Sequence, residues 1–569
     1  MRVLSMLVVM LSLLACGDKK TPVASKPVNT PAELHALNAS FTRAVEKVTD
    51  GVYVAIGFGL ANSIMIEGDE GLIIVDTMES VQQGEAVLAA FREISNKPVV
   101  AIIYTHNHTD HVFGSAAFGS PGELAIYAHD TTQYYIDRVI NVVRPVINLR
   151  SMRMFGNYLP EDEMVNDGIG AFLGIDSDSR LFAMPPTHTF SDQLQLKIAG
   201  VDIELVHAPG ETNDQIFVWL PQQRVLLPGD NIYKAFPNLY TIRGTPYRDV
   251  SQWVDSLDKM RQRQPQFLVP SHTRPIVGAE QVDTTLQVYR DAIQFVHDQT
   301  VRYMNKGLTP DQIVERVRLP EHLASHPYLQ EFYGKVDWSV RSIFDGYMGW
   351  FDGNSSTLLP LGEHQQATRM AQLAGGQDQL LSQARAALAD QDYQWVLSLT
   401  DHLLVLEELE ATPLRAQALR ALGEQQSNPN ARHYYFTQAR ELANQLTIND
   451  SPRVDPEFLA TLPIANFIYA MPPLLKAEET LDVDAVMGFH FSDSDRHFRV
   501  HIRRGVAEVS EGQSPPANSV IVTDEQTWKE VAAGLRSPAT AAVSGDLSIE
   551  GGKIALLRFL RYFEKSVRN

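Results

Sequence analysis

The sequence THNHTDH, residues 105–111, places three histidines and one aspartate within seven positions. It directly follows VVAIIY (99–104), an apolar run rich in β-branched residues that predicts a buried strand. Open α/β sheets bind ligands beyond the carboxyl ends of their strands, so we expect this motif to lie in a loop at that edge. In an extended loop His106 and His108 point the same way and can bind one metal ion, while Asp110 and His111 can face a second.

The segments around this motif alternate between strand and helix patterns. GLIIVD (71–76) is a nearly continuous apolar strand, and SVQQGEAVLAAFREISN (80–96) has the helical spacing of apolar residues. Further strands are predicted in LQLKIAGVDIELVHAP (194–209), IFVWLP (216–221), RVLLPGD (224–230) and FLVPSH (267–272). Strands and helices that alternate in this way predict an α/β fold.

The patterns change further along the chain. From about residue 285 to 445 the apolar spacing is helical, and in RHFRVHIRRGVAEV (496–509) alternation places Phe498, Val500 and Ile502 on one face of a strand. Single hydrophobic cores stop growing near ~250 to 300 residues, so a chain of 569 residues is expected to form several domains. We predict three: an α/β domain over residues 46–300, an all-α domain over 301–447 and a small α+β domain over 448–569.

The N-terminus, MRVLSMLVVMLSLLACGDKK (1–20), has one arginine and then an apolar run too short to span a bilayer. LLAC (13–16) resembles a bacterial lipobox, which implies a signal peptide of residues 1–15, lipidation of Cys16 and export. We therefore expect a lipoprotein on the periplasmic side of the inner or outer membrane, held only through Cys16, with a flexible tether over residues 16–45. An ordinary secretory signal with an incidental cysteine is the alternative.

Charge and cysteine content limit the possible partners. The formal net charge of −20 would repel the phosphate backbone of a nucleic acid, and the sequence has no basic stripe to offset it. We therefore expect no nucleic-acid partner and a small-molecule substrate. Cys16 is the only cysteine, so no intramolecular disulfide can form.

The histidine motif resembles that of the metallo-β-lactamase superfamily, which implies a four-layer αββα sandwich with a zinc site. In HAPGETNDQIFVWLP (207–221), Glu211 stands where that superfamily usually has its third histidine. This exchange, with GFGLANSIMIEGDEGLIIVD (57–76), NLYTIRG (238–244) and GYMGWFDGN (346–354), resembles the alkylsulfatase branch. That resemblance implies that the all-α domain is a dimerisation domain and that the last domain is similar to sterol carriers.

The resemblance implies two zinc ions per chain. The implied ligands are His106, His108 and Glu211 for the first ion, Asp110, His111 and His272 for the second, and Asp230 as the bridge. It also assigns catalysis to Asp110 and Asp230. The family usually has glutamate at the bridge, so Asp230 is a departure, and Asp214 lies close enough in sequence to compete with Glu211. A site of imidazoles and carboxylates also accepts manganese or iron.

The implied reaction is the hydrolysis of alkyl sulfate esters to alcohol and inorganic sulfate by a homodimer. Two divalent cations lower the pKa of a water towards neutrality, which serves hydrolysis. Thr241 and Arg243, two positions apart in an extended segment, lie on one side of it, and the resemblance assigns them to sulfate binding. Arg274, beside His272, could add charge to the same pocket.

One departure bears on the reaction. In YGKVDWSV (333–340), Trp338 stands where the family has a histidine that is a proposed general acid. Inorganic sulfate is a weak base and leaves without protonation, whereas an alkoxide does not. The hypothesis is therefore that the carbon–oxygen bond is cleaved, or that the substrate differs from that of the family.

Two other functions remain open from the sequence. The same metal site could hydrolyse a lactone, a thioester or a β-lactam. Alternatively, the chain could be a lipid-binding or scaffolding lipoprotein whose metal site is structural or vestigial. Within the alkylsulfatase resemblance, the last domain is implied to form an apolar trough that gathers the alkyl tail.

Overall fold

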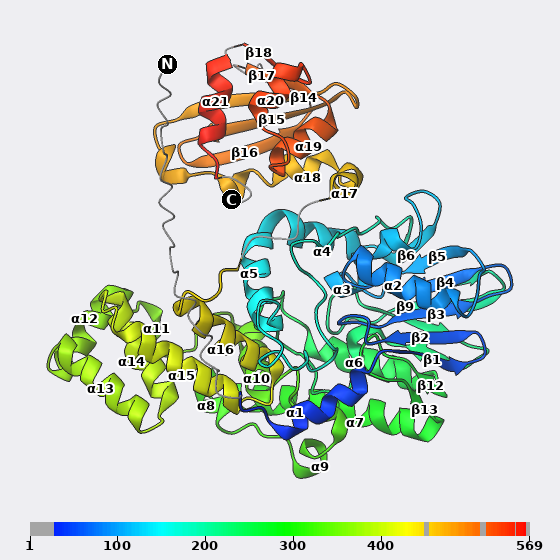
Figure 1. The fold of residues 1–569 in the computed structure, drawn as a ribbon, viewed down its shortest axis with the longest axis horizontal. Helices are drawn as coiled ribbons and strands as arrows, with labels where there is room; N and C mark the ends of the chain where they lie inside the picture. The colour runs from blue at the N-terminus through cyan, green and yellow to red at the C-terminus, as the bar shows by residue number, and fades with distance from the viewer. Residues whose placement is uncertain (1–27, 449–454, 513–518, 552, 565–569) are drawn as a thin grey trace, which may run out of the picture.

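The computed structural model describes residues 28–448, 455–512, 519–551 and 553–564. The predicted signal peptide (1–15), Cys16 and residues 16–27 of the predicted tether lie outside them. Figure 1 shows three parts: two stacked sheets with their helices in blue to green, a helical part in yellow-green, and a smaller sheet with its helices in orange to red. Within the described residues, no helix is both long and apolar enough to cross a bilayer.

The first sheet contains the strand that precedes the THNHTDH motif. Its seven strands lie in chain order, antiparallel from β1 to β4 and parallel from β4 to β7. They are β1 Ala44–Thr49, β2 Val52–Ile56, β3 Ser63–Glu67, β4 Leu72–Val75, β5 Val99–Ile103, β6 Ala125–His129 and β7 His188–Phe190. The helix predicted over 80–96 is α2 (Val81–Arg92), which is capped by the Ser80 side chain and connects β4 to the parallel β5.

The second sheet has six strands in the order β13-β12-β11-β10-β9-β8. Only the β11–β12 pair is parallel. The strands are β8 Gln193–Ile198, β9 Val201–His207, β10 Ile216–Leu220, β11 Val225–Leu227, β12 Phe267–Leu268 and β13 Ile276–Val277. All residues of β10 and β11 are buried, which explains the continuous apolar runs in their sequences.

Hydrophobic clusters show how the layers stack. Side chains of both sheets, such as Ile73 and Val218, share one core, so the sheets lie face to face. The other face of the first sheet packs on α2, and that of the second sheet on α6 (Val250–Gln262), α7 (Ala279–Met304) and α10 (Val336–Met348). The predicted αββα sandwich is therefore confirmed.

The helical part contains a core of leucine and alanine side chains from neighbouring helices. Its helices are α11 Ser355–Leu358, α12 Glu363–Ala374, α13 Gln377–Ala389, α14 Tyr393–Val405, α15 Ala411–Gln425 and α16 Pro429–Leu442. The shorter helices elsewhere in the first 330 residues are α1 Ala32–Leu37, α3 Thr109–Val112, α4 Thr132–Arg138, α5 Arg144–Phe155, α8 Pro310–Val314 and α9 Glu321–Ala324. Glu163 joins this part to the sandwich, because its buried carboxylate contacts Arg420 and Arg440, each at 2.6 Å.

The last part is the predicted α+β domain. Its sheet has the order β16-β15-β14-β17-β18, with helices packed on one face. The elements are α17 Pro456–Thr461, α18 Ile464–Tyr469, β14 Asp484–Phe491, β15 Arg496–Arg503, β16 Val506–Glu511, β17 Ser519–Thr523, α19 Glu525–Ala532, α20 Pro538–Ser544, β18 Leu547–Glu550 and α21 Lys553–Arg561. Phe498, Val500 and Ile502 are buried against the helices, as the alternation predicted.

The described end of the predicted tether is folded. Leu34 and Leu37 on α1, with Phe41 after it, are buried, and the guanidinium of Arg432 donates to the Asn29 carbonyl at 3.1 Å. The prediction of a flexible tether over 16–45 is therefore wrong for residues 29–45. Three large apolar residues at spacings of three and four positions are enough to dock this short segment.

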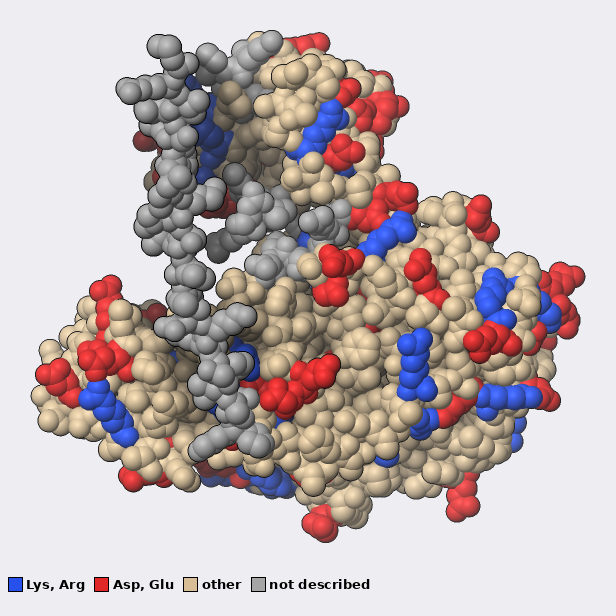
Figure 2. All heavy atoms as spheres, viewed as in Figure 1, with Lys and Arg blue, Asp and Glu red and all other residues tan. Residues whose placement is uncertain are grey.

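On the face shown in Figure 2, basic and acidic side chains are interspersed over the described residues and form no continuous basic stripe.

Candidate metal centre

The ends of four strands from the two sheets bring the predicted ligands together. His106 and His108 follow β5, with Asp110 and His111 on α3; Glu211 follows β9, Asp230 lies in the short 3₁₀ helix after β11, and His272 follows β12. The β4 end contributes Asp76, which no pattern in the sequence assigned to the site. Six of the seven predicted ligands are buried, with exposed fractions from 0% at His106, His111 and His272 to 8% at Asp110, and His108 is half-buried.

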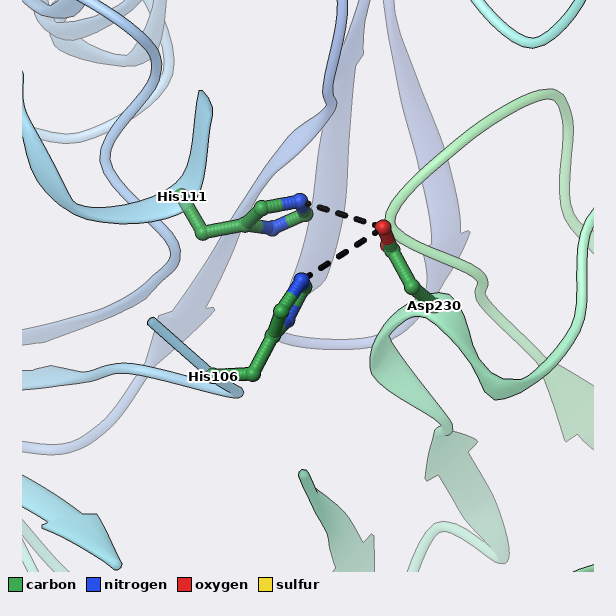
Figure 3. Close-up of side chains that lie close together, drawn as sticks. All are labelled: His106, His111 and Asp230. Atoms are coloured by element: carbon green, nitrogen blue, oxygen red, sulfur yellow. Dashed lines mark ion pairs between the residues drawn. The ribbon is translucent and has the colours of Figure 1, made fainter. Parts of the chain in front are cut away.

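Asp230 is the centre of this arrangement. Its Oδ2 atom lies 3.5 Å from His106 Nε2, 3.4 Å from His111 Nε2 and 3.2 Å from His272 Nε2. Figure 3 shows His106 and His111 pointing from one side of the site towards the Asp230 carboxylate on the other. One oxygen that faces three imidazoles has the position of a bridge.

The other predicted ligands form two groups around Asp230. Asp110 Oδ2 lies 3.4 Å from His111 Nε2 and 3.5 Å from His272 Nε2, and these three side chains form one candidate ion-binding group. His108, Glu211 and Asp230 form another. His106 joins the two, since its Nε2 lies 2.9 Å from His108 Nδ1.

The spacing of the ligand atoms fits metal ions. In a tetrahedral site with metal–ligand distances of ~2.0–2.1 Å, two ligand atoms lie about 3.3–3.4 Å apart. The five histidine–carboxylate distances around Asp230 and Asp110 run from 3.2 to 3.5 Å. Asp230 Oδ1, Glu211 Oε2 and His111 Nε2 are buried without a hydrogen-bond partner, which is costly unless a cation binds them. The site is built to hold metal ions.

Side chains and carbonyls behind the ligands fix the orientation of two histidines. Asp76 Oδ2 accepts hydrogen bonds from His111 Nδ1, Thr105 Oγ1 and Ser271 Oγ, each at 2.8 Å. His272 Nδ1 donates to the Leu60 carbonyl at 2.9 Å. Each contact leaves the opposite ring nitrogen, Nε2, with a lone pair directed into the site. The signal for Asp76 was its place at the end of an apolar strand beside the strand of the motif.

The electrostatics of the site agree with cation binding. Burial lowers the pKa of His106 and of His108 well below the usual value, which keeps both imidazoles neutral. Burial also opposes a charge on His111, yet the carboxylates of Asp230 and Asp110 raise its pKa well above the usual value. The same carboxylates that stabilise a proton on His111 create a negative electrostatic potential, which favours the binding of a cation.

A buried cation lies next to Glu211. Arg248 is 1% exposed, and its Nη1 contacts Glu211 Oε1 at 3.0 Å and the Asn238 carbonyl. The Nε and Nη2 atoms of Arg248 and both side-chain atoms of Asn238 are buried without a partner. Sequence reasoning did not identify Arg248 or Asn238, although NLYTIRG begins with Asn238.

The other candidate residues lie around this centre or away from it. Arg243 Nη2 is 3.1 Å from His108 Nε2, and the buried Thr241 hydroxyl contacts Met154 Sδ at 3.3 Å. Arg274 turns away from the site, since it pairs with Glu46 and donates to the Thr42 carbonyl. Asp214 accepts from Asn107 Nδ2 and belongs to no candidate ion-binding group of the described residues.

Known proteins match along nearly the whole chain. Family models match residues 56–272 (metallo-beta-lactamase superfamily), 309–445 (alkyl sulfatase dimerisation) and 452–569 (alkyl sulfatase C-terminal). A linear primary-alkylsulfatase of a Pseudomonas species is 39% identical over 523 residues, which are 88% of this chain and 98% of that protein. An (R)-specific secondary-alkylsulfatase of a Pseudomonas species is 27% identical, over 93% of this chain and 82% of that one.

A solved structure extends this likeness to three dimensions. The stereoselective inverting sec-alkylsulfatase Pisa1 from Pseudomonas sp. matches with a TM-score of 0.85 and 25% identity, over 94% of this chain and 91% of that chain. The three family models follow one another in the order of the three parts of the fold. The chain therefore belongs to the alkylsulfatases, the sulfuric ester hydrolases of the metallo-β-lactamase superfamily.

Proposed function

We propose that this enzyme hydrolyses alkyl sulfate esters with two zinc ions per chain, held by the seven side chains that meet at Asp230. The observation that carries the proposal is the Asp230 Oδ2 atom, which faces three histidines of a buried site at metal–ligand spacing. Such ions, when bound, lower the pKa of a water and neutralise developing negative charge. The spread of the family likeness over all three parts disfavours a lactone, thioester or β-lactam hydrolase and a vestigial site.

Four side chains support sulfate binding beside the metal ligands. Arg243 lies against His108, and Thr241 is buried in the same segment. Arg248 and Asn238 add unpaired buried donors. A guanidinium and an amide are strong donors to sulfate oxygens, and they are worth most where water is excluded. We assign Thr241, Arg243, Arg248 and Asn238 to the sulfate group.

The cleaved bond follows from the leaving group. Trp338 lies on α10, with the Lys335 ammonium 6.0 Å from its ring centroid, and an indole cannot supply a proton to an alkoxide. Sulfate leaves unprotonated, so cleavage is at the carbon–oxygen bond. In oxygen-18 water the label should appear in the alcohol, and label in the sulfate would refute this step.

The direct test is release of sulfate from dodecyl sulfate by the purified protein, measured by ion chromatography with and without added zinc. His108→Ala should abolish release because it removes a ligand. His188→Ala is the matched control, since His188 is exposed on β7 and belongs to no candidate ion-binding group. Full activity of the His108 variant, or no release by the metallated wild type with any alkyl sulfate, would refute the proposal.

The apolar surface of residues 347–361 supports a homodimer. Trp350 is 72% exposed and Leu359 is 90% exposed, beside the exposed Tyr347, Met348 and Leu358. Apolar side chains that gather in this way mark protein interfaces. Sedimentation should show that Trp350→Ser with Leu359→Ser gives a monomer, whereas Leu409→Ser, at an exposed leucine outside this surface, leaves the dimer intact. A dimer that survives the double substitution would refute this interface.

The N-terminal sequence supports export as a lipoprotein. We assign the lipid to Cys16 and the enzyme to the periplasmic side of the bacterial inner or outer membrane. Metabolic labelling with a radioactive fatty acid should mark the protein, and Cys16→Ser should remove both the label and the membrane association. An unlabelled wild type would refute the lipid anchor.

A further inference from the structure

A second group of histidines lies in the last domain, on the hairpin of β14 and β15. His490 and His497 stand directly opposite each other in the antiparallel register. Their rings are stacked with centroids 4.2 Å apart and an interplanar angle of 7°. Both side chains are 31% exposed and lie on the sheet face opposite the one that carries the core residues Phe489 and Phe498.

The turn between the strands brings a carboxylate to this pair. Asp495, the last residue of the turn, has a φ of 51°, in the left-handed region that aspartate enters more readily than most residues. Its Oδ1 atom lies 3.2 Å from His490 Nε2 and 3.4 Å from His497 Nε2. All three atoms lie within 4.8 Å of one another.

These distances repeat those of the active-site cluster. The two histidine–carboxylate distances, 3.2 and 3.4 Å, fall within the 3.2–3.5 Å found around Asp230 and Asp110, and they lie close to the edge of a tetrahedral metal site, about 3.3–3.4 Å. A simple ion pair would need one imidazolium beside one carboxylate. Exposed pairs of that kind gain about 0–1 kcal/mol, and they do not require a second imidazole at the same oxygen.

The surroundings leave the three ligands free for an ion. In the described part of the chain, neither imidazole has a hydrogen-bond or ion-pair partner other than Asp495. The same turn also contacts α19, because Asp493 Oδ1 accepts from the Glu525 amide at 3.1 Å and Ser494 Oγ donates to Glu525 Oε1 at 2.7 Å. An ion at this place would hold together β14, β15 and the turn between them, which is itself bound to α19.

We propose that His490, Asp495 and His497 bind one divalent transition-metal ion, separate from the catalytic centre, with water in the remaining position. Two imidazoles and one carboxylate suit zinc, nickel and copper, and disfavour calcium and magnesium, which prefer oxygen ligands. The ion stabilises the last domain by joining the two strands of its β14–β15 hairpin. The site does not depend on the proposed function, since none of its residues belongs to the catalytic cluster.

The test is equilibrium dialysis of the full protein against zinc over the micromolar range, with bound metal measured by inductively coupled plasma mass spectrometry. His490→Gln and His497→Gln should each bind one zinc fewer than wild type and keep full sulfatase activity. His501→Gln is the matched control. His501 lies on the same strand and face and pairs with Asp484 at 2.8 Å, but it has no second histidine at that carboxylate.

A second measurement separates metal loss from misfolding. Copper added to the zinc-loaded protein should give an electron paramagnetic resonance signal with nitrogen coupling in wild type and in His501→Gln, and none in His490→Gln with an unchanged circular dichroism spectrum. The proposal is overturned if His490→Gln binds as much zinc as wild type at every concentration, or if His501→Gln loses the ion as well.

Discussion

Asp76→Asn tests how strongly the residues behind the ligands control metal binding. Asp76 adopts a φ of 60°, which asparagine also tolerates, so the backbone strain changes little. The Asp76 Oδ2 atom accepts from His111, Thr105 and Ser271, and Oδ1 accepts from the Thr105 amide at 2.8 Å. Two of these partners cannot accept from a new N–H group: the Thr105 amide, which only donates, and His111 Nδ1, which carries a proton whenever Nε2 is free to bind a metal ion.

An asparagine therefore loses one of these bonds in either orientation. If its NH₂ replaces Oδ1, it faces the Thr105 amide; if it replaces Oδ2, it faces His111 Nδ1, which must then give up its proton. That proton moves to Nε2, the atom that faces Asp110 and Asp230. A hydrogen bond to a charged group is worth ~1.5–3 kcal/mol. At ~1.4 kcal/mol for each factor of ten, zinc should bind about 10- to 100-fold more weakly.

Competition with a chromophoric chelator measures this change directly. Asp167→Asn is the matched control, because Asp167 is equally buried and lies 3.3 Å from a histidine, His433, that is not a predicted ligand. The control should lower the melting temperature without changing zinc affinity. Zinc affinity of the Asp76 variant within twofold of wild type, with the fold intact, would show that Asp76 does not orient His111.

Two further predictions concern Arg248 and Glu79. Arg248→Met removes the two unpaired donors Nε and Nη2 that we assign to the sulfate group, and it should lower kcat/KM at least 100-fold, because each hydrogen bond to a charged group is worth ~1.5–3 kcal/mol. Asp249→Ala removes only the cap of α6, so it should cost ~1 kcal/mol of stability and leave kcat/KM unchanged; equal kinetic losses would refute the assignment. Burial raises the pKa of Glu79 from 4.5 to about 8, so the folded protein holds this proton more tightly than the unfolded chain does. The contribution of this proton to the free energy of unfolding is complete below pH 4.5. It falls by about 1.4 kcal/mol for each pH unit between 4.5 and about 8, and it is lost as the pH rises through about 8. Thermal melts of Glu79→Gln should show a shallower fall over this range, and a slope equal to wild type would contradict the prediction.

Local patterns in the sequence were sufficient to predict the elements and the place of the motif. The apolar run before THNHTDH forms β5, and the helical spacing over 80–96 forms α2. Alternation in 496–509 correctly separated the two faces of β15. Each of these signals lies within one helix or strand, where the spacing of apolar residues along the sequence directly reflects which face is buried.

Contacts between distant residues were not visible in the same way. Asp76 is 195 residues from Ser271, and the two meet only because β4 and the loop after β12 end at the same edge. Arg248 lies 37 positions after Glu211, in an irregular segment without periodicity. The short apolar set Leu34, Leu37 and Phe41 was hidden among polar and proline residues, so the folded end of the tether was missed.

The pair of Glu211 and Arg248 gives a physical reason for the glutamate. A neutral histidine at this position would need no counter-charge, whereas a buried carboxylate beside Asp230 is costly unless a cation pairs with it. The guanidinium of Arg248 supplies that cation, since its Nη1 lies 3.0 Å from Glu211 Oε1. Glutamate and arginine together therefore leave the net charge of the site the same as a neutral histidine would. They do add two buried N–H donors without a partner, at Nε and Nη2, and the fork of a guanidinium matches the oxygens of anions such as sulfate. An arginine added to a histidine site would instead leave an extra positive charge, which would retain the doubly charged sulfate product.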